Sequence, residues 1–140
     1  MFNKLNVKQE KKKPMEKKES IISLHGDHIE WINKLDFYKD DLKIFNNRLA
    51  EIVSKNNHTE VLAEIEKFQN QFIVQNDNID QIKHIINLDE DKIIKEINSN
   101  PIAVDHRTMS HSGEKDLVDT FEKNFKSIRE EFNKFSAKWM

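Results

Sequence analysis

Apolar residues recur at alternating spacings of three and four over three long stretches of the chain, which predicts three helices. In the first stretch the repeated positions are Ile21, Leu24, His28, Trp31, Leu35, Tyr38, Leu42, Phe45, Leu49 and Ile52. In the second they are Val61, Ile65, Phe68, Phe72, Gln75, Ile79, Ile82, Ile86, Asp89 and Ile93. In the third they are Val118, Phe121, Phe125, Ile128, Phe132, Phe135 and Trp139. Because a 3-4 repeat keeps one face of a helix turned toward a neighbour, we expect these helices to pack against each other.

Local signals place the ends of the predicted helices. The three helices are expected at about 21–56, 59–99 and 113–140. Asn57-His58-Thr59-Glu60 resembles a capping box, which starts the second helix. Asn100-Pro101 ends that helix, because the residue before a proline is pushed out of the α region. Residues 100–112 are then a connector. The Gly26-Asp27 pair is a candidate break in the first helix, with Asp27 capping a restart at His28.

The composition favours a helical fold. Gly and Pro occur only twice each in 140 residues, against average usage of roughly 7% and 5%, which leaves little room for a turn-rich β fold. A chain of this length is one domain, here residues 21–140. The very short first connection forces the first two helices into an antiparallel hairpin, and the longer second connection lets the third helix fold back alongside both. The sequence therefore predicts an all-α, antiparallel up-down-up three-helix bundle with long, coiled-coil-like helices.

Residues 1–20 differ from the rest of the chain. They hold seven Lys against three Glu in charge blocks without an apolar period, so a disordered Lys-rich tail is expected. In the remainder, basic residues alternate with acidic ones, which disfavours a nucleic-acid groove. No apolar run approaches the roughly 20 residues that span a bilayer, and the N-terminus lacks the apolar core of a secretory signal. A cytoplasmic location is the expectation.

The sequence contains no motif typical of an enzyme. The absence of cysteine excludes disulfides, thiolate zinc sites and thiol catalysis. There is no Gly-rich phosphate loop, and the abundant acidic residues fall mostly on helical faces expected to be exposed. We therefore expect a protein that acts without catalysis.

A length mismatch points to one end of the bundle. The first two predicted helices extend about 35–40 residues and the third about 27, which leaves roughly 15 Å of hairpin uncovered near Asn57. The apolar residues of this tip, residues 45–65, are Leu49, Ile52, Val53, Val61, Leu62 and Ile65. An uncovered apolar strip marks an interface, so we expect a homo-oligomer or docking of a helical partner protein there. A third helix that starts earlier, or that slides toward the tip, would remove the strip.

The opposite end of the bundle collects histidines and offers an alternative function. The antiparallel register places His25 and His28 near Asp89, and folding back of the third helix brings His111 and Glu114 to the same end. Imidazole and carboxylate groups are ligands for zinc, iron or manganese. The candidate ligands of a metal-binding bundle are His25, His28, His84, Asp89, His106 and His111. The same groups also suit capping and His–Asp hydrogen bonds, and the Glu-x-x-His pairs of dimetal bundles do not occur.

Four strings carry a resemblance to other proteins. They are Trp31-x-x-x-Leu35-x-Phe37-Tyr38-Lys39-Asp40-Asp41-Leu42, Phe68-Gln69-Asn70-Gln71-Phe72-Ile73, Val104-Asp105-His106-Arg107 and Ala137-Lys138-Trp139-Met140. With these strings the chain resembles an uncharacterised family of small bacterial all-helical proteins, over nearly all of its length beyond the tail. The resemblance implies a bacterial, cytoplasmic, helical protein. It implies no activity, so no site residues are carried over from it.

Overall fold

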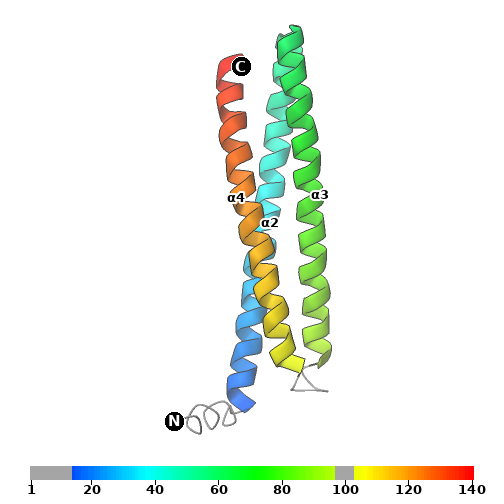
Figure 1. Ribbon diagram of the computed structural model, residues 1–140, viewed down its shortest axis with the longest axis vertical. Coiled ribbons are helices and arrows are strands. Elements are labelled where there is room, and N and C mark those ends of the chain that lie inside the picture. The colour runs from blue at the N-terminus through cyan, green and yellow to red at the C-terminus, as the bar shows by residue number, and fades with distance from the viewer. Residues whose placement is uncertain (1–13, 97–102) are drawn as a thin grey trace.

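Three long helices make up the described part of the protein. The computed structural model describes the backbone of residues 14–96 and 103–140 and the side chains of residues 21–95 and 111–140. The helices are α2 (Pro14–Lys55), α3 (Thr59–Glu96) and α4 (Ala103–Trp139), and no strand occurs among these residues. They pack side by side, with α2 and α4 running in one direction and α3 in the other (Figure 1). The predicted all-α, up-down-up three-helix bundle is confirmed.

Two helices begin earlier than the spacing of apolar residues predicted. α2 begins at Pro14 instead of residue 21, which suits proline because the first helical position needs no backbone N–H. It continues unbroken through Gly26, whose φ is not positive. α4 begins at Ala103 and not near residue 113, so it spans 37 residues. Residues 1–13, the greater part of the predicted tail, lie outside the described residues.

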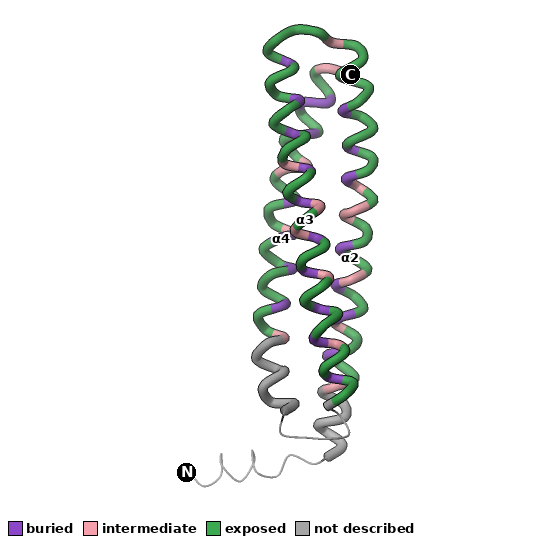
Figure 2. The backbone as a smooth tube through the Cα atoms, turned by 90° about the vertical axis from the view of Figure 1, so that its right-hand side faces the viewer, coloured by how far each residue is buried: buried purple, intermediate pink, exposed green. Residues whose placement is uncertain are grey.

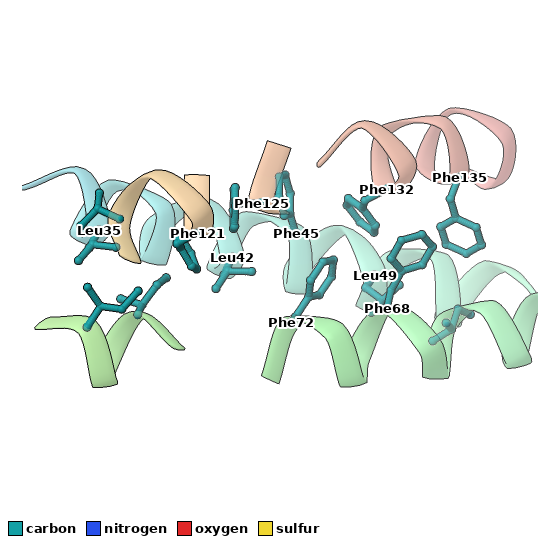
Figure 3. Close-up of a cluster of buried hydrophobic side chains, with 14 of the residues drawn as sticks. Leu35, Leu42, Phe45, Leu49, Phe68, Phe72, Phe121, Phe125, Phe132 and Phe135 are labelled. Atoms are coloured by element: carbon teal, nitrogen blue, oxygen red, sulfur yellow. The ribbon is translucent and has the colours of Figure 1, made fainter. Parts of the chain in front are cut away.

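The repeated apolar positions form the core. Every repeated position of α3 is buried, and every one of α2 and α4 is buried or half-buried, which gives the regular purple and pink bands of Figure 2. Phenylalanine rings from all three helices meet in the core of the bundle (Figure 3). The centroid of the Phe132 ring lies 5.0 Å from that of Phe45 and 5.1 Å from that of Phe72. Burial of one such ring stabilises the fold by about 1.5–3 kcal/mol.

The end of α4 covers the hairpin tip. The side-chain Nδ2 of Asn56, in the α2–α3 turn, donates hydrogen bonds to the carbonyl oxygens of Ile52 at 2.9 Å and Trp139 at 3.2 Å. The Trp139 side chain is half-buried against the core. The expectation of a tip without a third helix over it is therefore wrong. The expectation fails because α4 starts earlier and is longer than predicted. Its last turn therefore reaches Asn56, and α4 ends just below the top of the α2–α3 hairpin (Figure 1).

Ion pairs between helices line the outside of the bundle. Arg129 on α4 donates to Asp41 on α2 at 2.6 Å, and Lys39 on α2 donates to Asp80 on α3 at 2.6 Å. An exposed pair such as Lys39–Asp80 contributes about 0–1 kcal/mol, so it adds little to the stability of the fold. Over the described ranges, no helix has an apolar segment of the length that would cross a membrane.

Candidate metal centre

Polar residues interrupt the apolar core at the end of the bundle where α2 and α4 begin and α3 ends. His28 on α2 and Asp89 on α3 occupy repeated core positions, and the repeat of α4 extended backward from Val118 reaches Glu114 and then His111. The exposed fractions are 2% for His28, 5% for Asp89 and 4% for Glu114. Burial of such groups is unfavourable unless they are paired, and their partners are found within the same cluster.

Both ring nitrogens of His28 face carboxylate oxygens. Nδ1 lies 2.5 Å from Oε2 of Glu90 on α3, and Nε2 lies 2.8 Å from Oε2 of Glu114 on α4. Oδ2 of Asp89 is 3.7 Å from the same Nε2. A protonated imidazole donates from both nitrogens, so His28 joins all three helices at one level of the bundle.

Among the residues whose side chains are described, His111 has a hydrogen-bonding partner on one side of its ring only. Its Nε2 lies 3.0 Å from Oδ2 of Asp27 on α2. Its Nδ1 is buried, makes no hydrogen bond with the described residues, and lies 3.8 Å from Oε2 of Glu114. The Trp31 indole stacks on the His111 ring with centroids 4.6 Å apart. Trp31 therefore separates the cluster from the phenylalanine core and fixes the plane of the imidazole.

The geometry fits a metal ion. One ligand atom from each of His28, His111 and Glu114 lies within 4.8 Å of the others. Ligand atoms around a tetrahedral zinc ion with bonds of about 2.0–2.1 Å are about 3.3 Å apart, so the observed separations of 2.8 Å and 3.8 Å lie on either side of that value. Glu90 on His28 and Asp27 on His111 occupy the positions of the carboxylates that orient metal-binding histidines in known sites.

Charges in the cluster favour a cation. Burial alone would lower the pKa of His28, but hydrogen bonds to Glu114 and Glu90 outweigh it and raise the pKa to about 9. Burial raises the pKa of Glu114; the hydrogen bond to His28 opposes that shift, and the neighbouring Asp89 carboxylate adds to it. Burial would raise the pKa of Glu90, but hydrogen bonds to His28 and His25 lower it. Positive charge is thus stabilised at the centre of the cluster.

The structure brings together half of the six metal ligands predicted from the sequence. His28, Asp89 and His111 converge, and His25 hydrogen-bonds Glu90 at the rim with about half of its side chain exposed. His84 is exposed on α3 and takes part in none of the cluster's hydrogen bonds or ion pairs. His106 lies outside the described side chains. The sequence interpretation omitted three carboxylates from the ligand set: Asp27, Glu90 and Glu114.

The apolar residues proposed for the hairpin tip divide into two groups. Leu49, Ile52, Val61 and Ile65 are buried in the bundle's own core, with exposed fractions of 3% or less. Val53 and Leu62 remain exposed, at 41% and 44%. An interface at residues 45–65 stays a prediction, now with these two side chains in place of a continuous strip.

Comparison with protein-family models, with curated proteins and with solved structures found no match for this chain. The resemblance to small bacterial helical proteins therefore stays a prediction. The function of the cluster has to be argued from its own geometry.

Proposed function

We propose that this helical bundle binds one divalent transition-metal ion between α2, α3 and α4. The observation that carries the proposal is the buried Nδ1 of His111, which has no hydrogen-bond partner among the described residues. Because the Asp27 carboxylate accepts the hydrogen on Nε2, a neutral His111 ring has its lone pair on Nδ1. A buried acceptor without a donor costs about 1–3 kcal/mol. A metal ion bound by that lone pair removes the cost.

The remaining ligands come from the other groups that face this nitrogen. Nε2 of His28 and a carboxylate oxygen of Glu114 complete a set of two histidines and one carboxylate. Asp89 adjoins the set, 3.7 Å from Nε2 of His28. In the metal-bound protein the ion takes the place of the proton on Nε2. Imidazole and carboxylate ligands are accepted by zinc, iron and manganese, and each of the three is a candidate.

Elemental analysis tests the proposal directly. Untagged protein is purified from rich medium without chelator and analysed by mass spectrometry for zinc, iron and manganese, with one ion per chain expected. Chelator-stripped protein is then titrated with Co²⁺, whose visible spectrum reports the ligands and the geometry. Absence of bound metal, together with absence of a saturable Co²⁺ spectrum, would contradict the proposal.

Matched variants separate the site from adventitious binding. His111→Ala and Glu114→Gln each remove one ligand and are expected to weaken Co²⁺ binding by at least tenfold. His84→Ala removes an exposed histidine of α3 outside the cluster and is expected to bind Co²⁺ as the parent protein does. Circular dichroism of each variant verifies that the helices are intact. Equal binding by all three variants would place the metal elsewhere.

A further inference from the structure

Each histidine of the proposed metal site divides its two ring nitrogens between an outer carboxylate and the centre of the cluster. Nδ1 of His28 faces Glu90, and Nε2 of His111 faces Asp27. The other two nitrogens both face Glu114, Nε2 of His28 at 2.8 Å and Nδ1 of His111 at 3.8 Å. Two of the carboxylates are thus engaged in orienting the imidazoles, and the ligands of the ion come from the groups at the centre.

Asp89 supplies a second carboxylate at this centre. It is 5% exposed at a repeated core position of α3, and its Oδ2 lies 3.7 Å from Nε2 of His28. Its carboxylate also neighbours that of Glu114. Two adjacent buried carboxylates repel each other when both are charged, and a cation between them removes the repulsion. As direct ligands, they balance the two charges of a divalent ion.

We infer that Asp89 is the fourth ligand of the ion, and that the ion is a structural clamp that draws α3 against α2 and α4. The inference rests on the proposed metal site. Two imidazoles and two carboxylates complete a closed tetrahedral site, whereas three protein ligands would leave one position open. The ligand atoms of His28, His111 and Glu114 lie within 4.8 Å of one another, and Asp89 stands just outside this set. Asp89 therefore moves inward when the ion binds, and α3 moves with it.

The packing between α3 and α4 leaves room for that movement. A hollow of about 440 Å³ lies between the two helices at this level, lined by Asp89 and Glu114. Leu88 and Leu117 line the same hollow and are exposed at 46% and 42%. An inward shift of α3 narrows the hollow and covers part of both leucines. Burial of this apolar surface then acts together with coordination of the ion.

The cluster separates this end of the bundle from the continuous apolar core, which explains why a clamp is useful here. The core reaches Trp31 on α2 and Ile86 on α3. Leu24 and Ile93 are buried beyond the cluster, at 5% and 4%, but they are not part of that core. Among the described side chains, little apolar contact holds this end, and such segments open locally at low free-energy cost. An ion that binds only the closed form favours it by mass action.

The Co²⁺ spectrum of the full chain tests the fourth ligand. The parent protein is expected to show the intense visible absorption of four-coordinate Co²⁺, and saturating azide is expected to leave that spectrum unchanged. Asp89→Asn is expected to bind Co²⁺ at least tenfold more weakly, and azide is expected to alter its spectrum because it displaces the weakly bound amide. Asp91→Asn, at an exposed position of the same helix, is the matched control and is expected to behave as the parent protein does.

Hydrogen exchange tests the clamp. Backbone amides of residues 86–95 in α3 are expected to exchange at least tenfold more slowly in the Co²⁺-loaded protein than in the chelator-stripped protein, because α3 has to release the ion in order to open. In Asp89→Asn at equal Co²⁺ occupancy, this protection is expected to be lost. Asp91→Asn is expected to retain it. Circular dichroism verifies that the variants are folded, and the two measurements on the parent protein decide the inference without them.

The outcomes separate this inference from the proposed function. Azide that alters the spectrum of the parent protein would show an open coordination position. Unchanged Co²⁺ affinity in Asp89→Asn would remove Asp89 from the ligands, and exchange at residues 86–95 that does not respond to Co²⁺ would exclude the clamp. Each of these results would overturn the inference while the metal site stands. Failure of Co²⁺ itself to bind would overturn the proposed function and this inference together.

Discussion

Asp27 on α2 accepts a hydrogen bond from Nε2 of His111 on α4 at 3.0 Å, although 84 positions separate the two residues in the chain. The contact directs the other ring nitrogen of His111 toward Glu114. It also explains why Asp27 is not the helix cap that its place after Gly26 predicted. The carboxylate serves a neighbouring helix, while α2 passes through this point without a break.

Replacement of Asp27 by Asn tests its role in orienting His111. The amide does not hold the ring as a carboxylate does, and loss of such outer-shell partners weakens metal affinity about 10–100-fold. We expect Asp27→Asn to bind one ion per chain with affinity lowered by that factor, measured by competition with a chromogenic chelator. Asp36→Asn, which alters a surface pair with Lys83, is the matched control. Unchanged affinity in Asp27→Asn would remove Asp27 from the site.

The stability of the metal-free protein should depend on pH through His28. Its pKa is raised from 6.5 to about 9 in the folded protein. The stabilisation is therefore fully present below pH 6.5 and is lost as the pH rises through about 9. The shift corresponds to roughly 3 kcal/mol at most. We expect the free energy of unfolding in urea, with chelator present, to fall by up to this amount between pH 6 and pH 10.

A pair of histidine variants assigns this pH dependence. His28→Gln is expected to be less stable than the parent protein at pH 6 and to approach it at pH 10, because the charged form of His28 is what the carboxylates stabilise. His84→Gln, at an exposed position of the same bundle, is expected to follow the parent curve throughout. An identical pH dependence in His28→Gln and the parent protein would assign the effect to other groups.

Two phenylalanine-to-alanine variants, one in the core and one on the surface, test how much a buried ring contributes to the free energy of unfolding. Phe132 is fully buried among Phe45, Phe68 and Phe72, and Phe132→Ala is expected to cost about 3–5 kcal/mol of unfolding free energy. Phe37 is 62% exposed on α2, and Phe37→Ala is expected to change stability by no more than about 0.5 kcal/mol. Urea denaturation measures both. Similar losses in the two variants would contradict the register of α2 or α4.

The sequence predicted the fold well because one signal repeats over most of the chain. Residues at alternating spacings of three and four in α2, such as Leu42, Phe45 and Leu49, are core positions in the structure. The ends of the helices were harder to predict, because residues near 103–112 are polar and carry no apolar period. The sequence therefore predicted a connector over 100–112, whereas the structure is helical from Ala103 onward.

The candidate site was only partly predictable, because its polar residues carry no apolar period. The 3-4 repeat of α4, continued backward from Val118, leads to Glu114 and His111, and this polar continuation of the core face was the available signal. Glu90 and Asp27 do not occupy repeated positions. They join the site because they are adjacent to residues that do, and because a partner on another helix lies within hydrogen-bonding distance. Such cross-helix contacts depend on the rotation of each helix, which a repeat alone does not define.

Substitutions at the hairpin tip decide whether it acts as an interface. Leu49 lies in the core, so Leu49→Asp is expected to unfold the bundle, and loss of an oligomer in that variant would say nothing about a surface. Leu62 is 44% exposed, so Leu62→Asp is expected to remain folded. An interface at residues 45–65 predicts that sedimentation equilibrium gives a lower mass for Leu62→Asp than for the parent protein. An equal mass would exclude self-association through this end of the hairpin, whose turn beside Asn56 is already in contact with Trp139.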